Sequence, residues 1–147
     1  MDILNNIDPK KGGVICSGIV FGFHGFSCIS FLINGGADAL AFYLFKQFWA
    51  MPFIEVILSL GMIILFTKID NESSKNMKLA LFMMAAAAWG LQFVSDIAVI
   101  IWVVDLSMKD PTAGWIVVIV ITVLINVGLT IVLLLNLKFA DMVRKKE

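Results

Sequence analysis

The stretch "WIVVIVITVLINVGLTIVLLLNL", residues 115–137, decides the fold class of this chain. It contains no charged residue, and its strongly polar residues are limited to threonines and asparagines. A helix needs about 20 consecutive apolar residues to cross the hydrocarbon core of a bilayer, because each residue adds about 1.5 Å along the axis. The stretch therefore predicts a transmembrane helix.

Three further apolar runs of similar length precede it, at about residues 14–34, 48–67 and 79–104. The chain is 61% hydrophobic and only 15% charged, whereas about 25% of the residues of a soluble domain are charged. The runs are apolar nearly all round, unlike the helices of a soluble bundle, which keep a polar face. Because short connections make successive helices antiparallel neighbours, the sequence predicts an all-α membrane protein. We expect one membrane domain, residues 1–147, formed by an antiparallel bundle of four transmembrane helices.

The basic residues predict the orientation of this bundle. Only Lys46 and Lys109 fall on one side of the expected membrane, and the other nine of the eleven Lys and Arg residues fall on the opposite side. Basic residues close to membrane helices favour the cytoplasmic side. We therefore expect both termini to be cytoplasmic, together with the nine basic residues Lys10, Lys11, Lys68, Lys75, Lys78, Lys138, Arg144, Lys145 and Lys146.

Each apolar run carries a strongly polar side chain in its interior. The rise of 1.5 Å per residue places these side chains about 10–16 Å from the outer helix ends, in one layer of the membrane. A charge at this depth costs about 2.5–3.5 kcal/mol on insertion scales, so the polar faces are expected to turn inward. We call the set the predicted polar layer: His24, Glu55, Gln92, Asp96 and Asn126.

Two interpretations of the predicted polar layer follow from its composition. The first is a hydrogen-bond network that fixes the register of the helices. For Asp96 the closest candidate partners are Gln92 in its own run and His24 or Asn126 across the bundle. The second is a binding site for a proton or another cation, because ionisable groups inside membranes often mark such routes.

Other classes of site lack support in the sequence. No paired ligand spacing such as HxxxH or CxxC occurs, so neither a metal site nor a cofactor is expected. The GxSxG, Walker and HExxH signatures are absent as well, so we do not expect an enzyme. The basic tail "VRKKE" is explained by topology, and no nucleic-acid partner is expected.

Small residues predict where helices approach one another. Gly18 and Gly22 form a GxxxG pattern in the first run, with Gly25 nearby, and the third run contains Ala85 and Ala88. Small residues allow the backbones of membrane helices to come close. These five residues are therefore the expected helix-packing positions.

Two segments resemble small tetraspan membrane proteins of the lysosome-associated (LAPTM-like) and MARVEL-like kinds. They are the basic, glycine-containing start "DPKKGGVICSGIVFGFHG", residues 8–25, and the basic hairpin "FTKIDNESSKNMKLALFM", residues 66–83. The long PY-motif tail of the lysosome-associated proteins does not occur in this chain. The resemblance implies a non-enzymatic membrane organiser or trafficking partner.

The functional expectation combines these points. We expect a multi-pass integral membrane protein that acts as an adaptor, organiser or accessory subunit through helix–helix contacts. Its partners would be membrane lipids and other membrane proteins or further copies of itself. The alternative is an oligomeric channel or a proton- or cation-coupled transporter subunit that uses the predicted polar layer.

Overall fold

Four helices make up the computed structural model, which describes residues 7–33, 51–70, 72–109 and 113–145. They are α1 (Pro9–Ile33), α3 (Met51–Lys68), α4 (Lys75–Lys109) and α5 (Ala113–Lys145). By length and composition, each of the four could cross a membrane. The structure thus confirms an all-helical chain with four apolar helices, which indicates a multi-pass membrane protein.

Local capping signals set where two helices begin. The Asp8 carboxylate accepts a hydrogen bond of 3.1 Å from the backbone N–H of Lys10, and Pro9 occupies the first helical position, where its missing N–H is harmless. At the start of α4, the Ser74 hydroxyl accepts a hydrogen bond of 3.3 Å from the Met77 N–H. The helices α4 and α5 are longer than the apolar runs at 79–104 and 115–137, because helical structure continues into their polar flanks.

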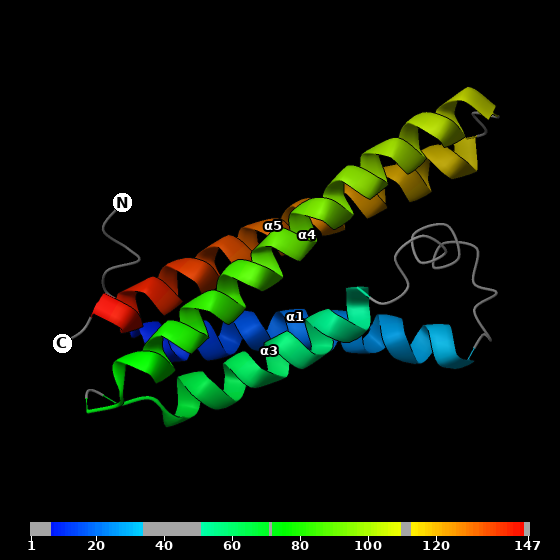
Figure 1. Cartoon of the computed structure of the whole chain (residues 1–147). Coiled ribbons are helices and arrows are strands. Elements are labelled where there is room, and N and C mark those ends of the chain that lie inside the picture. Colours follow the sequence, from blue (N-terminus) through cyan, green and yellow to red (C-terminus); the bar gives the residue numbers. More distant parts are fainter. Residues whose placement is uncertain (1–6, 34–50, 71, 110–112, 146–147) are drawn as a thin grey trace.

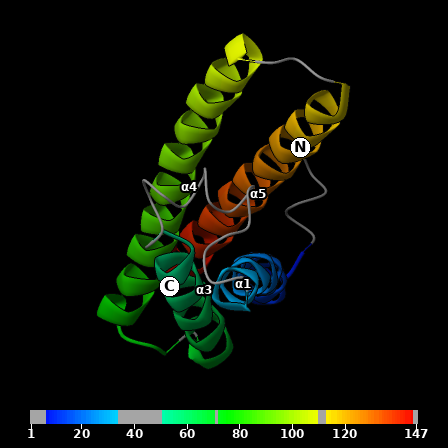
Figure 2. The same ribbon diagram turned by 90° about the vertical axis from the view of Figure 1, so that its right-hand side faces the viewer.

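The helices form two pairs that meet at one end and diverge toward the other (Figures 1 and 2). Helix α1 lies along α3, and α4 lies along α5; further contacts join α1 to α5 and α3 to α4. The first turn of α1, the last turn of α5 and the connection between α3 and α4 all lie at the end where the pairs meet (Figure 1).

The buried core occupies the end where the pairs meet. Two aromatic rings define it: Phe66 lies against Gly13 and Phe139 against Gly12, where a Cβ atom would overlap either ring. These glycines therefore allow α1 to approach α3 and α5. The buried cluster comprises Cys16, Val20, Met62, Phe66, Ile69, Leu81, Ala85, Ala88, Leu133, Phe139, Ala140 and Val143.

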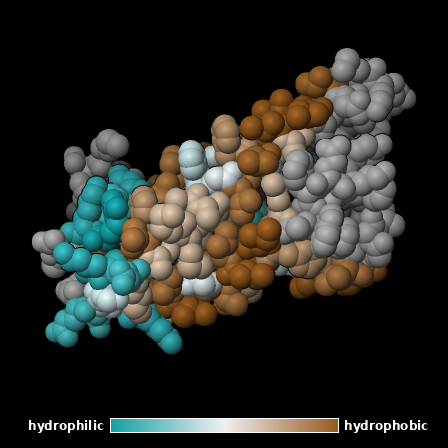
Figure 3. All heavy atoms as spheres, in the orientation of Figure 1, coloured by the Kyte–Doolittle hydropathy of each residue, from teal (hydrophilic) through white to brown (hydrophobic). Residues whose placement is uncertain are grey.

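The surface changes character along the molecule. Hydrophilic residues gather at the end where the pairs meet, and the remaining coloured part of the visible face is mostly apolar (Figure 3). At the hydrophilic end, Asp141 pairs with Arg144 and Lys145, each at 2.6 Å. The hydrogen bond from Lys145, together with the one from Arg144, holds the pKa of Asp141 below its ordinary value. Outside the hydrophilic end, many Ile, Leu, Val and Phe side chains are exposed on the surface of the helices. An apolar surface of this extent needs a hydrocarbon environment or a partner.

Candidate functional site: the intramembrane polar groups

Asp96 lies in a hydrogen-bond network between α4 and α5. Its Oδ1 accepts a hydrogen bond of 2.9 Å from Gln92 Nε2, and its Oδ2 accepts one of 2.5 Å from the Thr130 hydroxyl. Gln92 also donates to Asn126 Oδ1 at 3.1 Å, and Asn126 in turn donates to the Thr122 carbonyl at 2.9 Å. Both carboxylate oxygens therefore have a donor, and the network ties two neighbouring helices.

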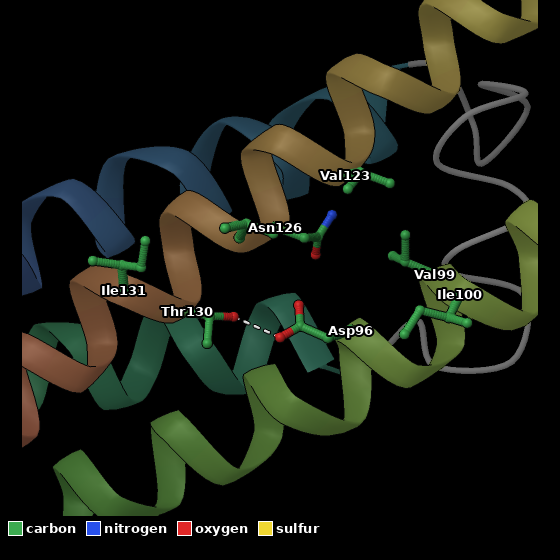
Figure 4. Close-up of a pocket in the computed structure, with 8 residues that line it drawn as sticks. Asp96, Val99, Ile100, Val123, Asn126, Thr130 and Ile131 are labelled. Carbon is green, nitrogen blue, oxygen red and sulfur yellow. Dashed lines mark hydrogen bonds between the residues drawn. The ribbon is translucent and has the colours of Figure 1, made fainter.

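A pocket of about 240 Å³ lies beside this network, between α4 and α5 (Figure 4). Asp96, Asn126 and Thr130 provide its polar groups, and the remainder of its wall is aliphatic. We call it the Asp96 groove. It is lined by Asp96, Val99 and Ile100 from α4 and by Val123, Asn126, Val127, Thr130 and Ile131 from α5.

His24 and Glu55 lie apart from the Asp96 network. His24 is 9% exposed and Glu55 2% exposed. His24 Nε2 and both carboxylate oxygens of Glu55 are buried and have no hydrogen-bond partner among the described residues. The nearby Ser59 hydroxyl donates instead to the backbone carbonyls of Glu55 and Val56, at 2.6 and 3.1 Å. The predicted polar layer thus divides into a hydrogen-bonded group on α4 and α5 and an unpartnered group on α1 and α3.

A second polar contact lies in the buried core and was not predicted. Asn136 Nδ2, on α5, donates to the Ser17 hydroxyl of α1 at 3.0 Å and lies 3.3 Å from the Met62 sulfur of α3. All three residues are fully buried. The sequence contained a signal for this contact, because Asn136, like Asn126, is an asparagine in the apolar run at 115–137. Asn136 lies near the end of that run, however, where a polar side chain can reach the membrane surface and needs no partner inside the bundle.

The expected packing positions fall into two groups. Ala85 and Ala88 are fully buried in the core. By contrast, a Cβ atom at Gly18, Gly22 or Gly25 would meet nothing within 4 Å, because no described helix covers that side of α1. Within the chain, the close approaches of α1 use Gly12 and Gly13, which lie inside α1 although they preceded the apolar run at 14–34.

The arrangement limits the chemistry available to the described residues. They contain no group of three or more His, Cys, Asp or Glu side chains that could hold a metal ion. Cys16 and Cys28 are both buried free thiols on α1. What the arrangement offers is hydrogen bonding and proton binding inside an apolar bundle.

Comparison with known proteins adds no relative. No protein-family model, no curated protein and no solved structure matches this chain. The functional argument therefore rests on the residues and their geometry.

Proposed function

We propose that this chain is a small membrane tetraspan that acts as a non-enzymatic adaptor, organiser or accessory subunit of a membrane protein assembly. It would work through helix–helix contacts within the bilayer, as an antiparallel four-helix bundle with both termini in the cytoplasm. The orientation is supported by the hydrophilic end of the molecule, where the basic residues that begin α1 and end α5 lie with the basic connection of α3 and α4.

The Asp96 groove is the observation that carries the proposal. It combines a carboxylate with aliphatic walls, and it lies within the apolar spans of α4 and α5. A carboxylate in hydrocarbon is stabilised by donors or by a cation, and Asp96 retains acceptor capacity beyond its bonds from Gln92 and Thr130. A partner helix with a basic or hydrogen-bond-donating side chain would supply this while its apolar surface covered the walls.

Site-specific crosslinking in native membranes tests this role. A photoreactive residue at Val127, which is exposed and lines the groove, is expected to give a defined adduct with a membrane protein. The matched position is Ile57, which is 68% exposed on α3 and does not line the groove. Equal adducts from both positions, or none from Val127, would contradict a partner in the groove.

A second candidate function is supported by His24 and Glu55. Three of their polar atoms are buried without a hydrogen bond, and unpartnered ionisable groups within a membrane often belong to a route for protons or cations. On this basis the chain would be a subunit of an oligomeric channel or coupled transporter, since four helices rarely enclose a pore alone.

Liposome flux separates the second candidate from the first. The purified chain, reconstituted with an internal pH-sensitive dye, would dissipate a proton gradient, and Glu55→Gln or Asp96→Asn would slow the dissipation at least about a hundredfold, the lower end of the loss typical of removing one proton-transfer group. A chain without flux, or with flux unchanged in both variants, rules the transport role out.

A further inference from the structure

His24 and Glu55 share two properties. Each is a buried ionisable side chain within the apolar part of α1 or α3, and each has at least one polar atom that no described residue satisfies. An unsatisfied buried polar atom destabilises the fold, and more so when it is charged. At both positions a bound proton or a hydrogen-bond donor would therefore stabilise the structure.

The contacts between α1 and α3 give the relative height of the two side chains. Gly13 lies against Phe66. Ser17 follows Gly13 by four residues on α1, and Met62 precedes Phe66 by four residues on α3. Both contact the same residue, Asn136, so they lie at the same height. Seven more residues in each direction lead from Ser17 to His24 and from Met62 to Glu55. Seven residues are about two helical turns, so the same faces are presented, and His24 and Glu55 lie level on the facing sides of α1 and α3.

The neighbouring helices offer no cation at this level. On α5, seven residues back from Asn136 is Leu129, which is 6% exposed and apolar. On α4, the contact of Gly61 with Met84 places Gly90 at the height of Glu55. The nearest described ionisable group on α4 is the hydrogen-bonded Asp96, and on α1 it is the buried thiol of Cys28, one turn from His24.

In the part of the chain that the structure describes, the basic residues of α1, α3 and α5 are remote from the pair. Lys11 lies thirteen residues from His24 on α1, and Lys68 lies thirteen residues from Glu55 on α3. At 1.5 Å per residue both are about 20 Å away. On α5 the first basic residue beyond Leu129 is Lys138, nine residues further on. Within the described helices, no fixed positive charge therefore compensates an ionised Glu55.

We propose that His24 and Glu55 together form an intramembrane proton-binding site between α1 and α3. With one proton bound to either group the pair is neutral: either Glu55 is a carboxylic acid and His24 a neutral imidazole, or His24 is an imidazolium and Glu55 a carboxylate. Release of this proton to water leaves a negative charge for which the described helices offer no cation, and burial disfavours such a charge. The site is independent of the Asp96 groove, and it binds a proton at equilibrium whether or not the chain transports one.

The protonation states of His24 and Glu55, measured at neutral pH on the wild-type chain in lipid nanodiscs, test the proposal. His24 is the only histidine, so ¹⁵N-histidine labelling gives one imidazole whose protonation is read directly. A hydrophobic carbodiimide, which reacts with protonated carboxyl groups, reports on Glu55 by mass spectrometry. We expect either an imidazolium at His24 or labelling at Glu55, and loss of that signal at alkaline pH. Neutral His24 together with unreactive Glu55 at neutral pH overturns the proposal.

Variants test whether the two residues share the proton. Potentiometric titration from neutral to alkaline pH is expected to release one proton more from the wild type than from Glu55→Gln, and the His24 titration should shift in the same variant. Asp96→Asn, which removes the other acid of the predicted polar layer, should leave the His24 titration unchanged. Identical His24 titration in the wild type and Glu55→Gln contradicts a shared site.

Discussion

Replacement of Gly13 by leucine is expected to destabilise the helix bundle by about 1–3 kcal/mol, because overpacking a filled core carries a cost of this size. A Cβ atom at Gly13 already overlaps the Phe66 ring, and Phe66 is fully buried in the core, so its ring cannot give way without shifting its neighbours. The measurement is the unfolding free energy of the purified chain in mixed detergent micelles.

The matched control is Gly18→Leu, the same substitution on the same helix. Nothing lies within 4 Å of a Cβ atom at Gly18, so the unfolding free energy should change by no more than about 0.5 kcal/mol. In a Phe66→Ala background, leucine at position 13 should instead fill vacated space and recover part of the lost stability. Equal effects of leucine at positions 13 and 18 would contradict the close contact of α1 with α3.

The second large effect concerns Asp96. If a partner helix engages the Asp96 groove through a basic or donor side chain, Asp96→Asn should weaken the association by about 2 kcal/mol or more, roughly thirtyfold, because a buried charge partner is lost. The chain itself should still fold, since asparagine has nearly the same shape and its carbonyl oxygen can accept the bond from Gln92 or Thr130. The yield of the adduct formed from Val127 measures the loss.

Asp141→Asn provides the control for net charge. It also removes one carboxylate, but from an ion-paired position at the hydrophilic end, away from the groove. Adduct yield should match that of the unsubstituted chain. If Asp96→Asn retains full yield, or if both variants lose it equally, recognition does not depend on the carboxylate in the groove.

The fold class was predictable because hydrophobic length alone decides it. Four long apolar runs leave few alternatives in a chain of this composition, and the structure contains four such helices. The same argument applies to the contact of Gln92 with Asp96, since a four-residue spacing brings side chains together on one helix whatever surrounds it.

The pairing between helices could not be predicted in the same way. Thr130 rather than His24 completes the contacts of Asp96, because α5 rather than α1 is the neighbour of α4 at that height. Likewise, the GxxxG pattern of Gly18 and Gly22 indicates a possible close approach without saying which face a neighbour covers. The crossing geometry of the helices decides both, and it depends on the whole core, including Phe66.

The joining of the two helix pairs at one end has a mechanical consequence. Helices are stiff, and from Ala85 in the core to the end of α4 at Lys109 the helix extends about 36 Å. Over this length, which follows from a rise of about 1.5 Å per residue, a rotation of about 10° at the packed end would displace the far end by about 6 Å. A small rearrangement at the contact of Asn136 with Ser17 and Met62 would be amplified in this way at the opposite end of the helices.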